Sequence, residues 1–104
     1  MMKSNISSGF EIIEDLIKLK WIPEILESIY SGNQHYTEIR RDIGEISHTE
    51  LNRKLALLIE KETIEKYEDQ GYTSYSLLEF GKELVHIFNH LVEIQEKYCD
   101  MGWN

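Results

Sequence analysis

The spacing of hydrophobic residues predicts a mostly helical chain. In residues 10–20, apolar side chains recur every three or four positions and cover an arc of about 200° around a helix axis. Residues 21–24 (Trp-Ile-Pro-Glu) predict a break and a new helix start, because proline is tolerated at the first helical position. Gly32-Asn33 ends that helix, and a short helix follows from Tyr36 or Thr37 to Ile43, with Gly44 as its end.

The clearest helix start is Ser47-His48-Thr49-Glu50. It fits a capping box in which Ser47 is the N-cap and the Glu50 side chain reaches back to the Ser47 backbone, with Ile46 and Leu51 placed for a hydrophobic staple. The predicted buried face of this helix consists of Leu51, Leu55, Leu58 and Ile59. The predicted exposed face of its first turns consists of His48, Thr49, Asn52, Arg53 and Lys54.

After Glu62 the pattern changes to that of strands. Residues 63–67 and 72–76 are rich in β-branched and aromatic side chains, and Glu68-Asp69-Gln70-Gly71 between them predicts a turn. A long helix follows over residues 78–98, again with an apolar arc of about 200°. Two such wide arcs favour a homodimer built on the first and last helices. The alternative is deep burial of both helices within one protomer.

Composition and charge limit the class of protein. The 104 residues, 41% hydrophobic and 29% charged, fit one folded domain over residues 1–104. We expect no membrane span, no secretory signal and a cytoplasmic location; the single cysteine, Cys99, cannot form an intramolecular disulfide. The net charge of −8 disfavours polyanion binding. However, residues 35–61 contain as many bases as acids, so the whole excess of negative charge lies outside this stretch.

The order of helices, capped helix, hairpin and long helix predicts a winged helix-turn-helix. We expect the helix-turn-helix at about 36–61, the wing at 63–77 and a C-terminal dimerisation helix at 78–98. The helix starting at Ser47 would enter a DNA major groove, where His48, Thr49, Asn52 and Arg53 reach base edges. The predicted phosphate contacts are Arg40, Arg41 and Lys54, with Lys66 on the wing. Arg40 and Arg41 have an alternative role as solvated charges paired with Glu38 and Asp42.

Several short motifs, in this order and spacing, resemble the HxlR-type (DUF24) winged-helix transcriptional regulators. They are Lys20-Trp21, Ile25-Leu26, Tyr36-Thr37-Glu38-Ile39-Arg40-Arg41, Ile46-Ser47 with Leu51 and Leu55, Tyr75-Ser76-Leu77, Gly81 and Leu84. The resemblance implies a bacterial homodimeric regulator that dimerises through its first and last helices and binds an inverted-repeat operator.

The chain also departs from that family. Residues 1–20 lack the cysteine of redox-sensing members, so thiol sensing by that route does not carry over. Glu62 stands where the family has a helix-ending glycine, which costs on the order of 1 kcal/mol if the backbone is left-handed. Leu78 replaces the family's polar cap, and Glu68 and Asp69 make the wing acidic.

Other chemistry is sparse, and no motif predicts a cofactor or catalysis. His86 and His90 have the spacing of metal ligands on one helix face, but two histidines alone are better interpreted as solvated side chains. Cys99 is expected to be a bystander thiol, and a redox or intersubunit role for it stays open. A small-molecule effector and a protein partner both stay open. The acidic charge and wing also support a second hypothesis, a winged-helix protein-interaction module with weak or lost DNA binding.

Overall fold

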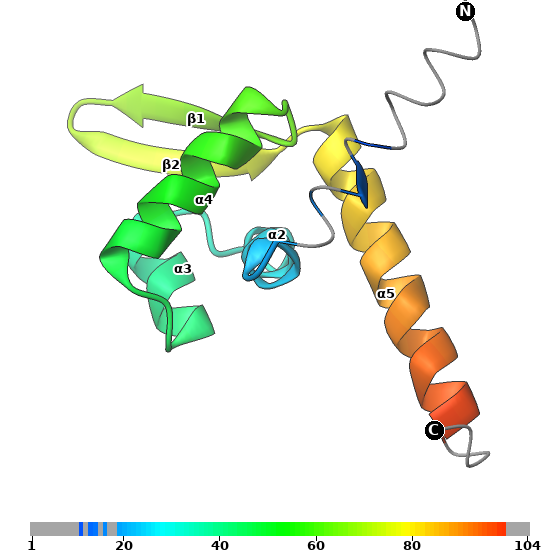
Figure 1. The fold of residues 1–104 in the computed structure, drawn as a ribbon. Coiled ribbons are helices and arrows are strands. Elements are labelled where there is room, and N and C mark those ends of the chain that lie inside the picture. Colours follow the sequence, from blue (N-terminus) through cyan, green and yellow to red (C-terminus); the bar gives the residue numbers. More distant parts are fainter. Residues whose placement is uncertain (1–10, 12, 15, 17–18, 100–104) are drawn as a thin grey trace, which may run out of the picture.

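The computed structural model describes residues 11, 13–14, 16 and 19–99, and Figure 1 shows their arrangement. The elements in chain order are α2 (Ile22–Tyr30), α3 (Tyr36–Ile43), α4 (His48–Glu60), β1 (Ile64–Asp69), β2 (Tyr72–Leu77) and α5 (Glu79–Cys99). This order confirms the predicted helices, hairpin and long helix. Residues 11, 13, 14 and 16 are also helical, and the other positions of the first predicted helix lie outside the described residues.

Helix α2 is the centre of the core. It contacts α3, α5 and β2, and Figure 1 shows it end-on between α3 and α5. Ile22, Ile25 and Leu26 of this helix are fully buried, and burying each such side chain contributes about 1.5–3 kcal/mol. The remaining fully or almost fully buried hydrophobic residues are Leu16, Ile39, Ile46, Leu51, Leu55, Leu58, Ile64, Leu84 and Val85.

The hairpin turn is tighter than predicted. Asp69 pairs with Tyr72, so the loop contains only Gln70 and Gly71. Both have left-handed backbone, with φ of 49° and 87°. Two successive residues of this kind form the two-residue turn whose twist matches that of paired strands. The prediction that residues 68–71 form the turn was therefore too long, because Glu68 and Asp69 continue β1.

Thr63 joins the end of α4 to the start of α5. This fully buried residue donates both its backbone N–H (3.0 Å) and its hydroxyl (2.8 Å) to the Leu58 carbonyl oxygen. Its own carbonyl accepts the Leu78 N–H at 3.0 Å. Gly81 packs so closely that an added Cβ would overlap the Thr63 carbonyl oxygen. Glu62, just before, has φ 58°, so the non-glycine residue does take the left-handed conformation.

Helix α5 is buried only in its first half. Its buried residues are Gly81, Leu84, Val85 and Phe88, whereas residues 89–99 are all exposed. Figure 1 shows this second half extending beyond the other elements. The exposed positions nevertheless include large apolar side chains, namely Ile87, Leu91, Val92, Ile94 and Tyr98. Deep burial of the whole helix within one protomer, the alternative considered from sequence, is therefore wrong. Within the described residues, no helix is both long and apolar enough to span a membrane.

Candidate nucleic-acid interface

Helix α4 begins with the predicted Ser47 cap, but the Glu50 side chain does not have its predicted partner. The Ser47 hydroxyl accepts the Glu50 N–H at 3.1 Å, and the flanking Ile46 and Leu51 are buried. The Glu50 carboxylate does not complete a capping box. It pairs with Lys54 Nζ at 3.0 Å, and this contact lowers the pKa of Glu50 below its ordinary value. The prediction for the Glu50 side chain was wrong because the lysine one turn later offers a charged donor.

The exposed face of α4 has four of the five predicted residues. His48, Thr49, Asn52 and Arg53 are exposed, together with the cap Ser47. Lys54 is different, since only 15% of its side chain is exposed and its ammonium contacts Glu50. The expectation that Lys54 belongs to the open face was wrong, because position 54 lies at the edge of the buried stripe of Leu51, Leu55 and Leu58. Lys54 therefore offers a partly neutralised charge.

Helix α3 brings two arginines beside the start of α4. Arg40 donates from Nε to the Ile46 carbonyl oxygen at 3.2 Å, which ties α3 to the turn before α4. Arg41 is exposed and has no ion pair within the part of the chain that the structure describes. The alternative considered from sequence, in which these arginines pair with Glu38 and Asp42, is not formed as an ion pair among the described residues. Glu38 instead accepts the N–H groups of His35 and Gln34, which lowers its pKa.

A contact between Tyr36 and His48 was missed by the sequence analysis. The Tyr36 hydroxyl lies 2.9 Å from His48 Nδ1, and the two rings are nearly parallel, with 5° between their planes. An open hollow of about 460 Å³ between α3 and α4 is lined by Tyr36, Thr37, Arg40, Arg41, Gly44 and His48. Twelve positions separate the two rings in sequence, so no periodicity signals the contact. It depends on the angle that Gly44, at φ 89°, gives the turn.

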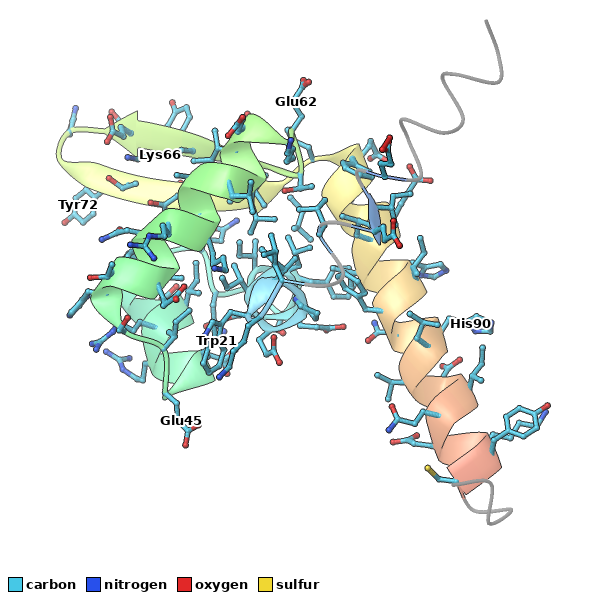
Figure 2. The ribbon with its side chains drawn as sticks, viewed as in Figure 1. Trp21, Glu45, Glu62, Lys66, Tyr72 and His90 are labelled. Atoms are coloured by element: carbon cyan, nitrogen blue, oxygen red, sulfur yellow. The ribbon has the colours of Figure 1, made fainter. Side chains whose placement is uncertain are left out.

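The wing is acidic on its outer face and carries a paired acid and base on its inner face. Lys66 shares the inner face with Tyr75 and pairs with Glu68 at 3.5 Å, so its charge is largely offset. Tyr75 is buried there, and burial raises its pKa. The strand register places Glu65, Tyr67, Asp69 and Tyr72 together on the outer face. Tyr67 and Tyr72 are 63% and 74% exposed, and Figure 2 shows Tyr72 pointing outward near the hairpin tip.

The remaining candidate groups form no site. His86 and His90 are both exposed, and His90 Nδ1 lies 3.6 Å from Glu93 Oε1. Among the described residues, no three histidine, cysteine or carboxylate side chains gather as metal ligands would. Cys99 is exposed near the end of α5.

A buried scaffold that presents a capped, exposed helix after a tight turn, followed by a two-stranded hairpin, defines a winged helix-turn-helix protein. The chain belongs to the HxlR-like helix-turn-helix family, which it matches over residues 16–102. Members of this family are transcriptional regulators that bind DNA. The sequence-based resemblance is thus confirmed, as are the fold class and the assignment to transcription regulation.

Solved structures agree on the fold. The reduced form of the transcriptional regulator YodB from B. subtilis is similar, with TM-score 0.76 and 23% identity over 91% of this chain and 92% of that chain. The diamide-treated form of YodB gives TM-score 0.72 at the same identity, over 90% and 92% of the two chains. A possible HxlR family transcriptional factor from Thermoplasma volcanium GSS1 gives TM-score 0.65 and 25% identity, over 88% and 83%. A comparison with curated proteins gives no match.

Proposed function

We propose that the chain is a homodimeric transcriptional regulator that reads an inverted-repeat DNA operator with α4. The observation that carries this proposal is the open face at the start of α4, where Thr49, Asn52 and Arg53 are exposed beside the arginines of α3. The N-terminal turns of a helix in this position enter a major groove. The membership of the chain in a family of DNA-binding regulators supports the same assignment.

The residues divide by the chemistry they offer. Arg53 can form two hydrogen bonds to guanine and Asn52 two to adenine, while Thr49 can contact either a base edge or a methyl group. Arg41 offers a full charge to a phosphate, and Arg40 offers the guanidinium nitrogens that its bond to Ile46 leaves. The full proposed DNA-contacting set is Arg40, Arg41, Ser47, His48, Thr49, Asn52, Arg53, Lys54 and Lys66. Lys54 and Lys66 are its weakest members, since each faces a carboxylate.

Dimerisation is supported by the second half of α5. Leu91 and Val92 are 47% and 50% exposed, one turn beyond the last buried residue, Phe88. A continuous apolar face of this kind is rarely left in water. A second copy of the chain would cover it, and a two-fold dimer would carry two α4 helices, as an inverted repeat requires.

Fluorescence anisotropy with the DNA upstream of its own coding region tests this function. The expected result is sequence-preferring binding whose affinity falls with salt as several phosphate contacts require. Arg53→Ala should relax sequence preference, whereas Arg41→Ala should weaken all duplexes by a similar factor and lower the salt slope by about one. Lys82→Ala, in the first turn of α5 and away from the exposed face at the start of α4, is the matched charge control. Equal affinity for operator and scrambled duplexes at low salt would contradict the proposal.

The outer face of the wing favours a second candidate function, a protein-interaction module with weak DNA binding. Two exposed tyrosines lie there: Tyr67 between the carboxylates of Glu65 and Asp69 along β1, and Tyr72 opposite Asp69 on β2. Carboxylates repel phosphates, and exposed tyrosines are common in protein interfaces. A stable complex with a partner protein, with no retention on DNA, would favour this module. Protection of an inverted repeat by the purified protein would exclude it.

A further inference from the structure

The contact between Tyr36 and His48 gives one ring nitrogen of the histidine, Nδ1, a hydrogen-bond partner. The Tyr36 hydroxyl lies 2.9 Å from Nδ1 and 3.3 Å from the His48 carbonyl oxygen. Tyr36 is itself half-buried at the first position of α3 and packs against the core, so its hydroxyl cannot move far. The structure records no hydrogen bond at His48 Nε2 within the described residues.

What His48 Nε2 offers depends on which acceptor takes the single hydrogen of the Tyr36 hydroxyl. A tyrosine hydroxyl has one hydrogen. It can go to the His48 carbonyl oxygen at 3.3 Å, in which case Nδ1–H donates to the Tyr36 oxygen, or to Nδ1, which is the shorter contact at 2.9 Å. A neutral imidazole bears one N–H, so a hydrogen bond accepted at Nδ1 leaves the proton on Nε2. His48 in this state offers a hydrogen-bond donor at Nε2. The nearly parallel rings further restrict the orientation of that donor.

The hollow beside this donor is suited to an anion. Arg40 and Arg41 line it together with Thr37, Tyr36, His48 and Gly44, and no carboxylate is among the lining residues. In a chain with net charge −8 this is an unusual stretch of surface. The guanidinium of Arg40 is held by its bond to the Ile46 carbonyl, which reduces the entropy lost on binding. Figure 2 shows Glu45, in the adjoining turn, extending away from the protein.

We propose that this hollow seats one phosphate of the DNA backbone, which His48 Nε2–H and the two arginines bind, and that Tyr36 is the positioning residue that sets the histidine for it. The inference rests on the proposed DNA-binding function and deepens it. It changes the role expected for His48 from contact with a base edge to contact with a phosphate. His48 then contributes to affinity and orientation and carries no sequence information of its own.

The first experiment measures the protonation pattern of His48 without DNA. Long-range ¹⁵N–¹H spectra at mildly alkaline pH distinguish a neutral ring with the proton on Nε2 from one with the proton on Nδ1. The wild-type protein should show the Nε2–H form, and Tyr36→Phe, which keeps the aromatic ring, should show a mixture of both forms. Tyr30→Phe, at an exposed position of α2, is the matched control and should leave His48 unchanged. A wild-type Nδ1–H form, or an identical pattern in Tyr36→Phe, would overturn the positioning role.

The second experiment compares two duplexes, the upstream DNA and a scrambled sequence of the same length. His48→Ala should weaken binding to both by the same factor, about tenfold, because it removes a hydrogen bond to a charged group. Tyr36→Phe should weaken both by a smaller common factor, and the double variant should be no weaker than His48→Ala alone. Replacing single phosphates with neutral methylphosphonates should locate one position where wild-type protein loses affinity and His48→Ala loses much less.

Each outcome has a separate meaning. If His48→Ala changes the ratio of affinities for the two duplexes, His48 contacts a base, and the phosphate seat is wrong. If Tyr36→Phe binds like wild type while His48→Ala does not, the positioning role is wrong. If wild-type protein binds no DNA, the proposed function fails and the phosphate seat with it. The spectra of the free protein would still decide whether Tyr36 orients His48.

Discussion

Replacing Gly81 with alanine tests the contact that joins α4 to α5. The added Cβ would overlap the carbonyl oxygen of Thr63 and lie 3.1 Å from Leu77 Cδ2. The Thr63 carbonyl belongs to a fully buried residue and already accepts the Leu78 N–H, so it cannot rotate away as a flexible side chain would. The first turn of α5 would have to move away from the end of α4.

Three contributions set the magnitude. Alanine in place of glycine favours the helix by about 1 kcal/mol. Overpacking against backbone costs about 1–3 kcal/mol, and weakening the hydrogen bond between Leu78 and Thr63 costs about 1 kcal/mol more. We therefore expect a net destabilisation of about 1–3 kcal/mol. For a domain of this size, each kcal/mol corresponds to a fall in Tm of about 4–8 °C.

Urea unfolding followed by circular dichroism, at one fixed protein concentration, measures the effect. Fixed concentration matters because dimerisation would add to the apparent stability. Asn89→Ala, at an exposed position of the same helix, should change the free energy of unfolding by no more than about 0.5 kcal/mol. A Gly81→Ala variant as stable as the wild type would refute the close approach of the two backbones.

Three further predictions follow from separate features. Leu91→Glu should yield a monomer with weakened DNA binding in analytical ultracentrifugation and anisotropy, while Asn89→Glu, on the opposite face of the helix, should stay dimeric; a dimeric Leu91→Glu would exclude this face of α5 from the interface. Glu62→Gly should raise the free energy of unfolding by about 0.5–1 kcal/mol in urea titrations, since φ is 58°; a loss of stability would contradict this. The pKa of Glu38 is lower in the folded protein than its ordinary value of 4.5, so near and below that pH the unfolded state binds more protons than the folded state. The stability that Glu38 contributes above pH 4.5 is therefore lost as the pH falls through its folded pKa. Glu38→Gln should therefore lose stability less steeply with acid than the wild type, and equal slopes would show that Glu38 does not contribute.

The main elements could be predicted from sequence because local signals agree with the core. The apolar stripe of α4 and the Ser47 cap both mark the same helix start, and Gly44 marks the turn before it. The hairpin was also predicted, although its turn was predicted to begin two residues too early, because Glu68 and Asp69 were assigned to the turn yet belong to a strand. The left-handed backbone of Gln70 and Gly71 forms a two-residue turn, and this turn sets the pairing of Asp69 with Tyr72.

The candidate site was predicted less completely. The exposure of Asn52 and Arg53 follows from helix periodicity, since the opposite face is apolar. Periodicity alone could not reveal that Lys54 pairs with Glu50, because an exposed and a half-buried lysine at a stripe edge have the same sequence pattern. The contact of Tyr36 with His48 depends on the geometry of the turn between α3 and α4, and the twelve positions between the two rings give no periodic signal.

The most direct test of the central claim is a hydroxyl-radical footprint of the purified protein on its own upstream DNA. If two copies of α4 enter successive major grooves, the footprint should contain two protected segments related by two-fold symmetry, with centres about 10 base pairs or a multiple apart. Arg53→Ala should erase the preference for these segments. Protection without two-fold symmetry, or no protection at concentrations where the duplex is fully bound, would contradict the assignment of α4 as the element that reads DNA.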